Sequence, residues 1–111
     1  MKADKEARAS RIATELKNLA GLFLKEVSDR STLITITNIR VTPDAKNATL
    51  YFTVLPEDKE NVALKFINRK KREFCDFVKS NSKIGRMPRI FFMIDEGEKN
   101  RIRIEEITKE L

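Results

Sequence analysis

The chain has 111 residues, and its 23 Lys and Arg against 17 Asp and Glu give a formal net charge of +6 at pH 7. This length predicts a single domain, residues 1–111, with enough chain to bury a core of its own. The chain has no His, one Cys and three Gly. This composition argues against a His general base, a Cys/His zinc site and a glycine-rich phosphate loop. We therefore expect that the protein is not an enzyme and binds neither a cofactor nor a metal.

The N-terminal segment MKADKEARAS carries charges of both signs and lacks the apolar stretch of a secretory signal. The longest apolar run, Ile90 to Ile94, is far too short to cross a bilayer. A single Cys permits no intramolecular disulfide, which suits a reducing compartment. We therefore expect a cytoplasmic monomer that contacts no membrane.

The first helix is predicted from apolar residues at helical spacing. Its apolar face contains Ile12, Leu16, Leu19, Phe23 and Val27. We expect this helix to run from about residue 4 to residue 27 and to end at the polar segment that follows.

An antiparallel hairpin is predicted next, over residues 32–55. Residues 33–41 alternate like a strand, but the parity of their apolar positions switches, which predicts a bulge near Thr37 and Asn38. A short polar turn leads to residues 48–55, which alternate cleanly. The short connection favours antiparallel pairing of the two strands.

A second helical region is predicted at about residues 59–79, with one irregularity. Lys70 falls in the middle of the apolar arc, where a buried charge is costly unless the side chain extends outward to water. The alternative is a helix that is interrupted at this position. We predict a break, kink or 3₁₀ distortion within Arg69–Arg72.

The C-terminal part is predicted to form a strand, a loop and a short helix. Residues 89–95 are apolar on both faces, which favours a central strand. The adjacent acids Asp95 and Glu96 could form a carboxylate pair, but we interpret them as turn residues that open a loop over 96–100. The order is α-β-β-α-β with a short final helix. The residues predicted to be buried together are Ile12, Leu16, Phe23, Leu50, Phe52, Phe74, Val78 and Phe92.

The positive charge is concentrated in one segment. Arg69–Arg89 contains eight Lys or Arg and two acids, so outside it 15 cations balance 15 acids. A solvated helix face with pairs such as Arg69–Glu73 and Arg72–Asp76 explains any one cation but not the clustering. Asymmetric basic charge is typical of a surface that binds a polyanion, so the segment predicts nucleic-acid binding. Most Phe residues occupy core-facing positions, so we expect little base stacking.

Three motifs occur in a fixed order along the chain. Residues 8–12 (RASRI) resemble an R-x-x-R-V pattern, residues 42–55 (TPDAKNATLYFTVL) resemble S-P-D-x-x-x-A-x-V-Y-x-S-V-L, and residues 86–95 (RMPRIFFMID) resemble R-x-V-P-x-L-x-F-x-x-D. Together they resemble the ribosome-binding factor A family of small-subunit assembly factors. The resemblance spans about Arg8 to Ile107, the predicted core of the domain.

The resemblance implies an α+β fold of the type II KH class, in which helices cover one face of a three-stranded sheet. KH domains clamp nucleic acid with a G-x-x-G loop, which this family replaces by a helix-kink-helix with an Ala-x-Gly interruption. By position the interruption falls on residues 70–72, where neither Ala nor Gly is present. The resemblance further implies a non-catalytic factor that binds small-subunit rRNA near the decoding region in late maturation, with a link to growth in the cold.

The predicted partners are the small ribosomal subunit and its rRNA, with no small-molecule substrate. Two alternatives remain open: a small hydrolase of the acylphosphatase type, for which no phosphate-cradling loop can be placed, and a protein-only interaction module that docks an acidic partner. The candidate RNA-binding residues are Arg8, Arg11, Arg69, Lys70, Lys71, Arg72, Lys79, Lys83, Arg86 and Arg89.

Overall fold

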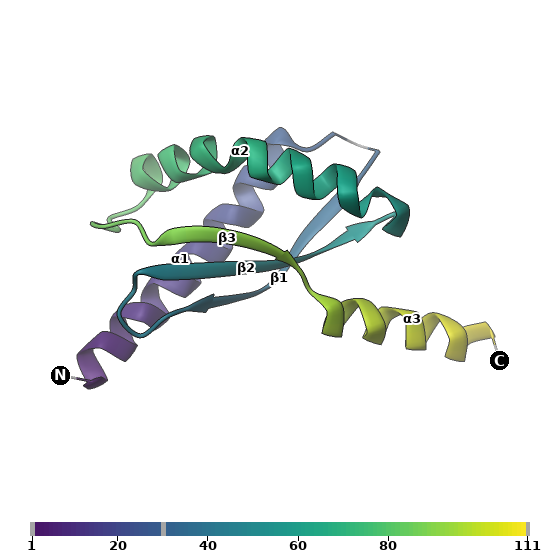
Figure 1. Cartoon of the computed structure of the whole chain (residues 1–111), viewed down its shortest axis with the longest axis horizontal. Coiled ribbons are helices and arrows are strands. Elements are labelled where there is room, and N and C mark those ends of the chain that lie inside the picture. The colour runs from purple at the N-terminus through teal and green to yellow at the C-terminus, as the bar shows by residue number, and fades with distance from the viewer. Residues whose placement is uncertain (1, 30, 111) are drawn as a thin grey trace.

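The computed structural model describes residues 2–29 and 31–110, with only the backbone described at 2–6 and 107–110. Its elements follow the predicted α+β order, with the final helix longer than expected (Figure 1). No helix among the described residues is long and apolar enough to span a membrane. The elements are α1 (Lys2–Val27), β1 (Leu33–Val41), β2 (Asn47–Leu55), the 3₁₀ helix η1 (Glu57–Lys59), α2 (Glu60–Asn81), β3 (Arg89–Ile94) and α3 (Glu96–Glu110).

The three strands form one sheet in the order β1-β2-β3. β2 pairs antiparallel with β1 and parallel with β3, which confirms the predicted hairpin. The prediction that the third strand is central is wrong, because β3 is an edge strand. Its two faces are apolar for different reasons: Ile90 is buried beneath the helices, whereas Phe91 and Met93 are exposed on the opposite face.

The predicted bulge is confirmed on β1, where the register with β2 shifts between Ile36 and Asn38. The extra residue, Thr37, restores the inward orientation of the apolar side chains beyond it, since strand side chains alternate strictly between the two faces. Ile36 before the bulge and Ile39 after it both pack against the core.

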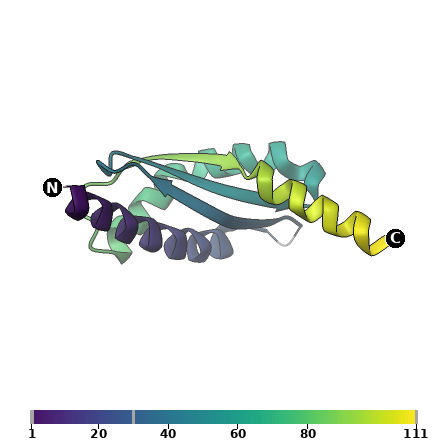
Figure 2. The same cartoon turned by 90° about the horizontal axis from the view of Figure 1, so that it is seen from below.

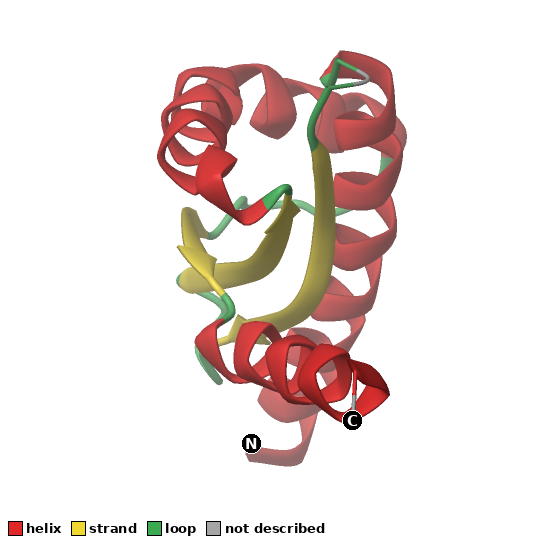
Figure 3. Ribbon diagram, turned by 90° about the vertical axis from the view of Figure 1, so that its right-hand side faces the viewer, coloured by secondary structure: helices red, strands yellow, loops and turns green. Residues whose placement is uncertain are grey.

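The two long helices cover the same face of the sheet, while α3 extends away from the end of the sheet at which β3 finishes (Figures 2 and 3). Between helices and sheet lies the core, in which the Phe74 ring is 5.5 Å from that of Phe23 and 6.0 Å from that of Phe92, centroid to centroid. Of the eight residues predicted to be buried together, seven are buried and Phe92 packs against them half-buried. The apolar periodicities therefore located the core correctly.

α2 is one continuous helix from Glu60 to Asn81, so the predicted break within Arg69–Arg72 is wrong. The Lys70 side chain extends along the helix surface instead. Its Nζ lies 6.0 Å from the centroid of the Phe66 ring and 3.4 Å from Oε1 of Glu73. The methylene groups thus cover apolar surface while the ammonium group reaches an acid and water, which avoids the cost of burying the charge. The helix has no reason to break.

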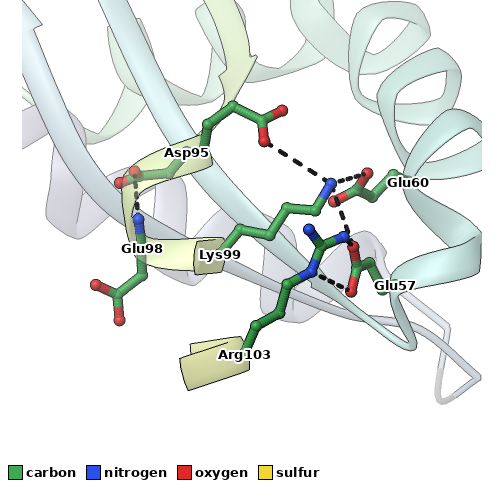
Figure 4. A network of polar contacts seen from close by, with 7 residues as sticks. Glu57, Glu60, Asp95, Glu98, Lys99 and Arg103 are labelled. Atoms are coloured by element: carbon green, nitrogen blue, oxygen red, sulfur yellow. Dashed lines mark hydrogen bonds and ion pairs between the residues drawn. The ribbon is translucent and has the colours of Figure 1, made fainter. Parts of the chain in front are cut away.

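Asp95 joins the sheet to α3. Its backbone N–H donates to the carbonyl of Phe52 at 2.8 Å, and its Oδ1 accepts a hydrogen bond from the N–H of Glu98 at 3.0 Å (Figure 4). This is an N-cap contact, so residues 96–100 are helical rather than the predicted loop. The hydroxyl of Thr37 in the bulge donates to Oδ2, and chiefly this bond lowers the pKa of Asp95.

An ion-pair network holds α3 beside the start of α2 (Figure 4). Lys99 Nζ lies 3.0 Å from Glu60 Oε1 and 3.3 Å from Glu57 Oε1, and Arg103 also pairs with Glu57. The hydrogen bond to Glu60 is the main cause that raises the pKa of Lys99. These contacts join residues about forty positions apart, so they link α3 to η1 and to the start of α2.

A continuous α2 makes a prediction for glycine substitutions. Lys70→Gly should lower the free energy of unfolding by about 1 kcal/mol relative to Lys70→Ala, the usual cost of glycine inside a helix. The same comparison at Lys65, an exposed position of the same helix, provides the matched control. Urea unfolding of the four variants tests this. If glycine costs much less at 70 than at 65, the helix is interrupted near Lys70.

The Thr37–Asp95 hydrogen bond predicts a pH-dependent effect. Thr37→Val should lower the free energy of unfolding by about 1.5 kcal/mol at pH 7, since the hydroxyl donates to a charged acceptor. The folded-state pKa of Asp95 lies below its ordinary value of 3.8, so this contribution is complete above pH 3.8 and is lost as the pH falls through the folded pKa. The difference in the free energy of unfolding between wild type and variant, measured with urea, should therefore become smaller at low pH. Thr35→Val, on the exposed face of the same strand, should show no such pH dependence.

Candidate nucleic-acid interface

The ten cations predicted to bind RNA come from α1, α2, the connection 82–88 and the start of β3. Eight are exposed, and Lys70 and Lys71 are half-buried. Most of them can be described in three groups according to the elements that carry them. Arg86 lies exposed in the connection, and Lys70 pairs with Glu73.

The first group is a ridge along α2 formed by Arg69, Arg72 and Lys79, called the α2 ridge below. Arg72 and Lys79 are seven residues apart, close to two helical turns, so their side chains leave the helix in nearly the same direction. The helix buries its opposite side in the core, which turns the ridge toward solvent. Among the described side chains, none of these three forms an ion pair, and Glu73, the expected partner of Arg69, pairs with Lys70 instead.

The second group surrounds a shallow pocket between α1 and the connection after α2. Arg8 and Arg11 of α1 and Lys83 line this pocket together with one acid, Glu15, and its volume is about 330 Å³. The connection is held by Ser82, whose hydroxyl donates to the carbonyl of Val78 at 2.7 Å and accepts from the N–H of Ile84 at 3.3 Å. The turn thereby brings a cation of the basic segment beside two cations about seventy residues earlier in the chain.

The third group lies at the edge strand. Lys71 Nζ lies 5.8 Å and Arg89 Cζ 5.9 Å from the centroid of the Phe91 ring. The backbone N–H of Arg89 donates to the carbonyl of Lys46 at 2.8 Å, which fixes the start of β3 beside the turn of the hairpin. Two cations thus flank one exposed aromatic ring.

Phe91 is the residue of this interface that sequence reasoning missed. Six of the seven Phe residues are buried or pack against the core, as predicted, whereas Phe91 is 40% exposed. The signal was present in the alternation of β3: Ile90 and Phe92 occupy one face, so Phe91 had to occupy the other. It was hidden because the strand was interpreted as buried on both faces.

Charge is distributed unevenly over the molecule. In the described part of the chain, ion pairs gather around α3, where Lys99, Arg101 and Arg103 meet acids of η1, α2 and α3. Of the ten candidate cations, Lys70 forms an ion pair with Glu73, and the other nine form no ion pair with the described residues. Many of them lie toward the end of the molecule opposite α3 (Figure 1). This end offers unneutralised positive charge to a polyanion.

Metal-ligating groups and the one cysteine can also be located in the structure. Within the described ranges, no three His, Cys, Asp or Glu side chains are grouped to hold a metal ion. Cys75 is half-buried and packs against the core, and burial raises the pKa of its thiol. A raised pKa disfavours the reactive thiolate, in agreement with the interpretation of this residue as a small apolar side chain.

Comparison with known proteins agrees with the motifs. The family model described as Ribosome-binding factor A matches residues 8–108. The ribosome-binding factor A of Thermobifida fusca is 32% identical over 104 residues, which are 91% of this chain and 69% of that protein. That of Saccharopolyspora erythraea is 41% identical over 59 residues, which are 51% of this chain and 36% of that protein.

Solved structures share the fold. The crystal structure of ribosome-binding factor A from Thermus thermophilus superposes with a TM-score of 0.68 at 21% identity, covering 78% of this chain and 93% of that one. A homology model of the Thermus thermophilus protein was fitted into the cryo-EM map of its complex with the 30S subunit. It superposes with a TM-score of 0.64 at 22% identity, covering 73% of this chain and 88% of that one. With its fold shared and its family model matched over nearly its whole length, the chain belongs to the ribosome-binding factor A family.

Proposed function

We propose that this protein binds the small ribosomal subunit through its rRNA during late maturation and assists rRNA folding and processing without catalysing a reaction. The observation that carries the proposal is the set of exposed cations outside any described ion pair, spread over the α2 ridge and the pocket of Arg8, Arg11 and Lys83. Family membership supports it, as does the complex of the Thermus thermophilus relative with the 30S subunit. The protein would act in the cytoplasm as a monomer.

The binding mode differs from that of a KH clamp. In this chain the position of the family's interruption is continuous helix, and its three cations point different ways: Lys70 toward Glu73, Lys71 toward Phe91 and Arg72 outward. The α2 ridge and the pocket cations would therefore contact phosphates, with the helix as a rigid support. Phosphate contacts fix the position of a protein on RNA but carry little sequence information. Specificity for the subunit would then rest on the shape of the folded rRNA.

Assistance without chemistry follows from differential binding. A protein shifts the equilibrium between two rRNA conformations only by the difference in its affinity for them. Cations held on rigid elements favour the conformation whose phosphates match their spacing, and affinity falls when the rRNA rearranges. The same property accounts for release from a mature subunit, since no nucleotide hydrolysis or covalent step is needed.

The α2 ridge predicts a change in salt dependence. The slope of log affinity against log salt grows by about 0.7 to 0.9 in magnitude for each phosphate neutralised. Replacing Arg72 and Lys79 together by Gln should therefore flatten the slope by about two contacts and weaken binding at low salt. Co-sedimentation with immature and mature small subunits across a salt series measures both quantities.

The matched control replaces Lys25 and Lys59 by Gln, which removes the same charge from exposed positions outside the basic segment. Substitutions of exposed residues of this kind change stability by less than about 0.5 kcal/mol. The two double variants and the wild type should therefore have nearly equal free energies of unfolding in urea. Equal weakening by both double variants would show diffuse attraction and contradict a defined interface. Turnover of an acyl phosphate by the wild type would instead support the hydrolase alternative.

A further inference from the structure

We propose that the outer face of the sheet around Phe91 binds single-stranded RNA by stacking unpaired bases on its aromatic rings. The inference rests on the proposed function for its partner class, since unpaired rRNA segments would be the ligand. It assigns a second surface, made by the sheet rather than by the helices. Its recognition would depend on bases, whereas the α2 ridge would contact phosphates.

The outer face presents two rings on neighbouring strands. Tyr51 of β2 lies between the buried Leu50 and Phe52, so its side chain points away from the helices. Tyr51 pairs with Met93 of β3, and Phe91 is the next outward residue along that strand. The two rings are therefore diagonal neighbours across the parallel pair, as are the aromatic side chains on which RNA-binding sheets stack successive bases.

This face is uncovered in the described part of the molecule. Both long helices pack on the opposite face (Figure 3), and α3 extends away from the end of the sheet at which β3 finishes (Figure 1). Phe91 is 40% exposed and Met93 52% exposed. Neighbouring exposed apolar side chains on a sheet mark a surface that gains by being covered.

The charges around the rings select a polyanion as the partner. Lys71 and Arg89 flank the Phe91 ring. Across the sheet from Phe91, Thr49 of β2 pairs with Phe91 and Arg40 of β1 pairs with Thr49, so all three point to the outer face. Asp95, beyond the end of β3, has its carboxylate occupied by Thr37 and the N–H of Glu98. Cations beside an aromatic ring suit a base with its flanking phosphates.

Single strands fit this face better than duplexes. The bases of a duplex are stacked on one another and cannot turn their faces to a protein ring. A flexible single strand can place one base on Phe91 while its phosphates contact Arg89 and Lys71. An exposed flat ring on a regular strand imposes little sequence preference, because every base has a π-face.

Tyr51 gives a direct spectroscopic test, since the chain has one Tyr and no Trp. Titration of the full chain with a mixed-sequence RNA hexamer should quench its tyrosine emission in a saturable way. The same hexamer with abasic sugars, or paired in a duplex, should leave the emission nearly unchanged at equal phosphate concentration. Quenching that is equal for the abasic strand would overturn the proposal.

The variants test the ring itself by anisotropy of the end-labelled hexamer. Phe91→Leu keeps an apolar side chain but removes the π-face, and should weaken binding by about 5- to 100-fold with the salt slope unchanged. Phe91→Tyr should bind like the wild type. Leu33→Ala, which trims an exposed apolar residue at the far end of β1 on the same face, should also bind like the wild type.

The outcomes separate this inference from the proposed function. If Phe91→Leu binds the hexamer as tightly as the wild type, the stacking surface is wrong even where subunit binding keeps its salt dependence. If the hexamer quenches the emission of Tyr51 and its affinity depends on Phe91, but the protein does not co-sediment with small subunits, the proposed function fails and the stacking surface stands. Affinity for polyglutamate that depends on Phe91, without affinity for the hexamer, would assign the face to an acidic protein and overturn the RNA assignment.

Discussion

The structure depends on the position of β2 between two strands of opposite orientation. β2 pairs with β1 on one side and with β3 on the other, and its inward residues Leu50 and Phe52 have no exposed surface. Because its inner side is buried along its whole length, α1 and α2 must cover the same face. The other face is then left without a layer, so one strand determines both the core and the open surface.

Electrostatics divides the molecule in a second way. The acids near α3 are used in ion pairs with Lys99, Arg101 and Arg103, while the cations of the basic segment, Lys70 apart, have no such partners among the described residues. Exposed ion pairs contribute little to stability, about 0 to 1 kcal/mol each. Their main consequence is the distribution of charge: positive charge is neutralised by acids around α3 and is not paired toward the opposite end of the molecule.

The basic segment contributes to two surfaces of different character. The α2 ridge is rigid and fully polar, and is suited to phosphates, whereas Lys71 and Arg89 belong to the same segment but turn toward an aromatic ring. A helix and the edge strand that follows it are adjacent in space, so one run of sequence reaches both faces of the molecule. The concentration of charge in 21 residues between Arg69 and Arg89 is thus consistent with a single RNA that is held by its backbone at one surface and by its bases at the other.

The sequence alone determined the two long helices, the hairpin, the bulge at Thr37 and the burial of Phe52 and Phe74, because these follow from periodicities of two and 3.6 residues within one segment. The motifs also indicated the family. Only the tertiary structure decided the strand order, since a strand that is apolar on both faces can lie at the centre or leave one apolar face exposed at the edge. It likewise decided the course of Lys70, the start of α3 and the grouping of the cations. The strand order and the grouping of the cations depend on contacts between segments far apart in the chain, which no local pattern records. The course of Lys70 and the start of α3 depend on contacts three or four positions away, and their side-chain geometry is not fixed by the apolar periodicity.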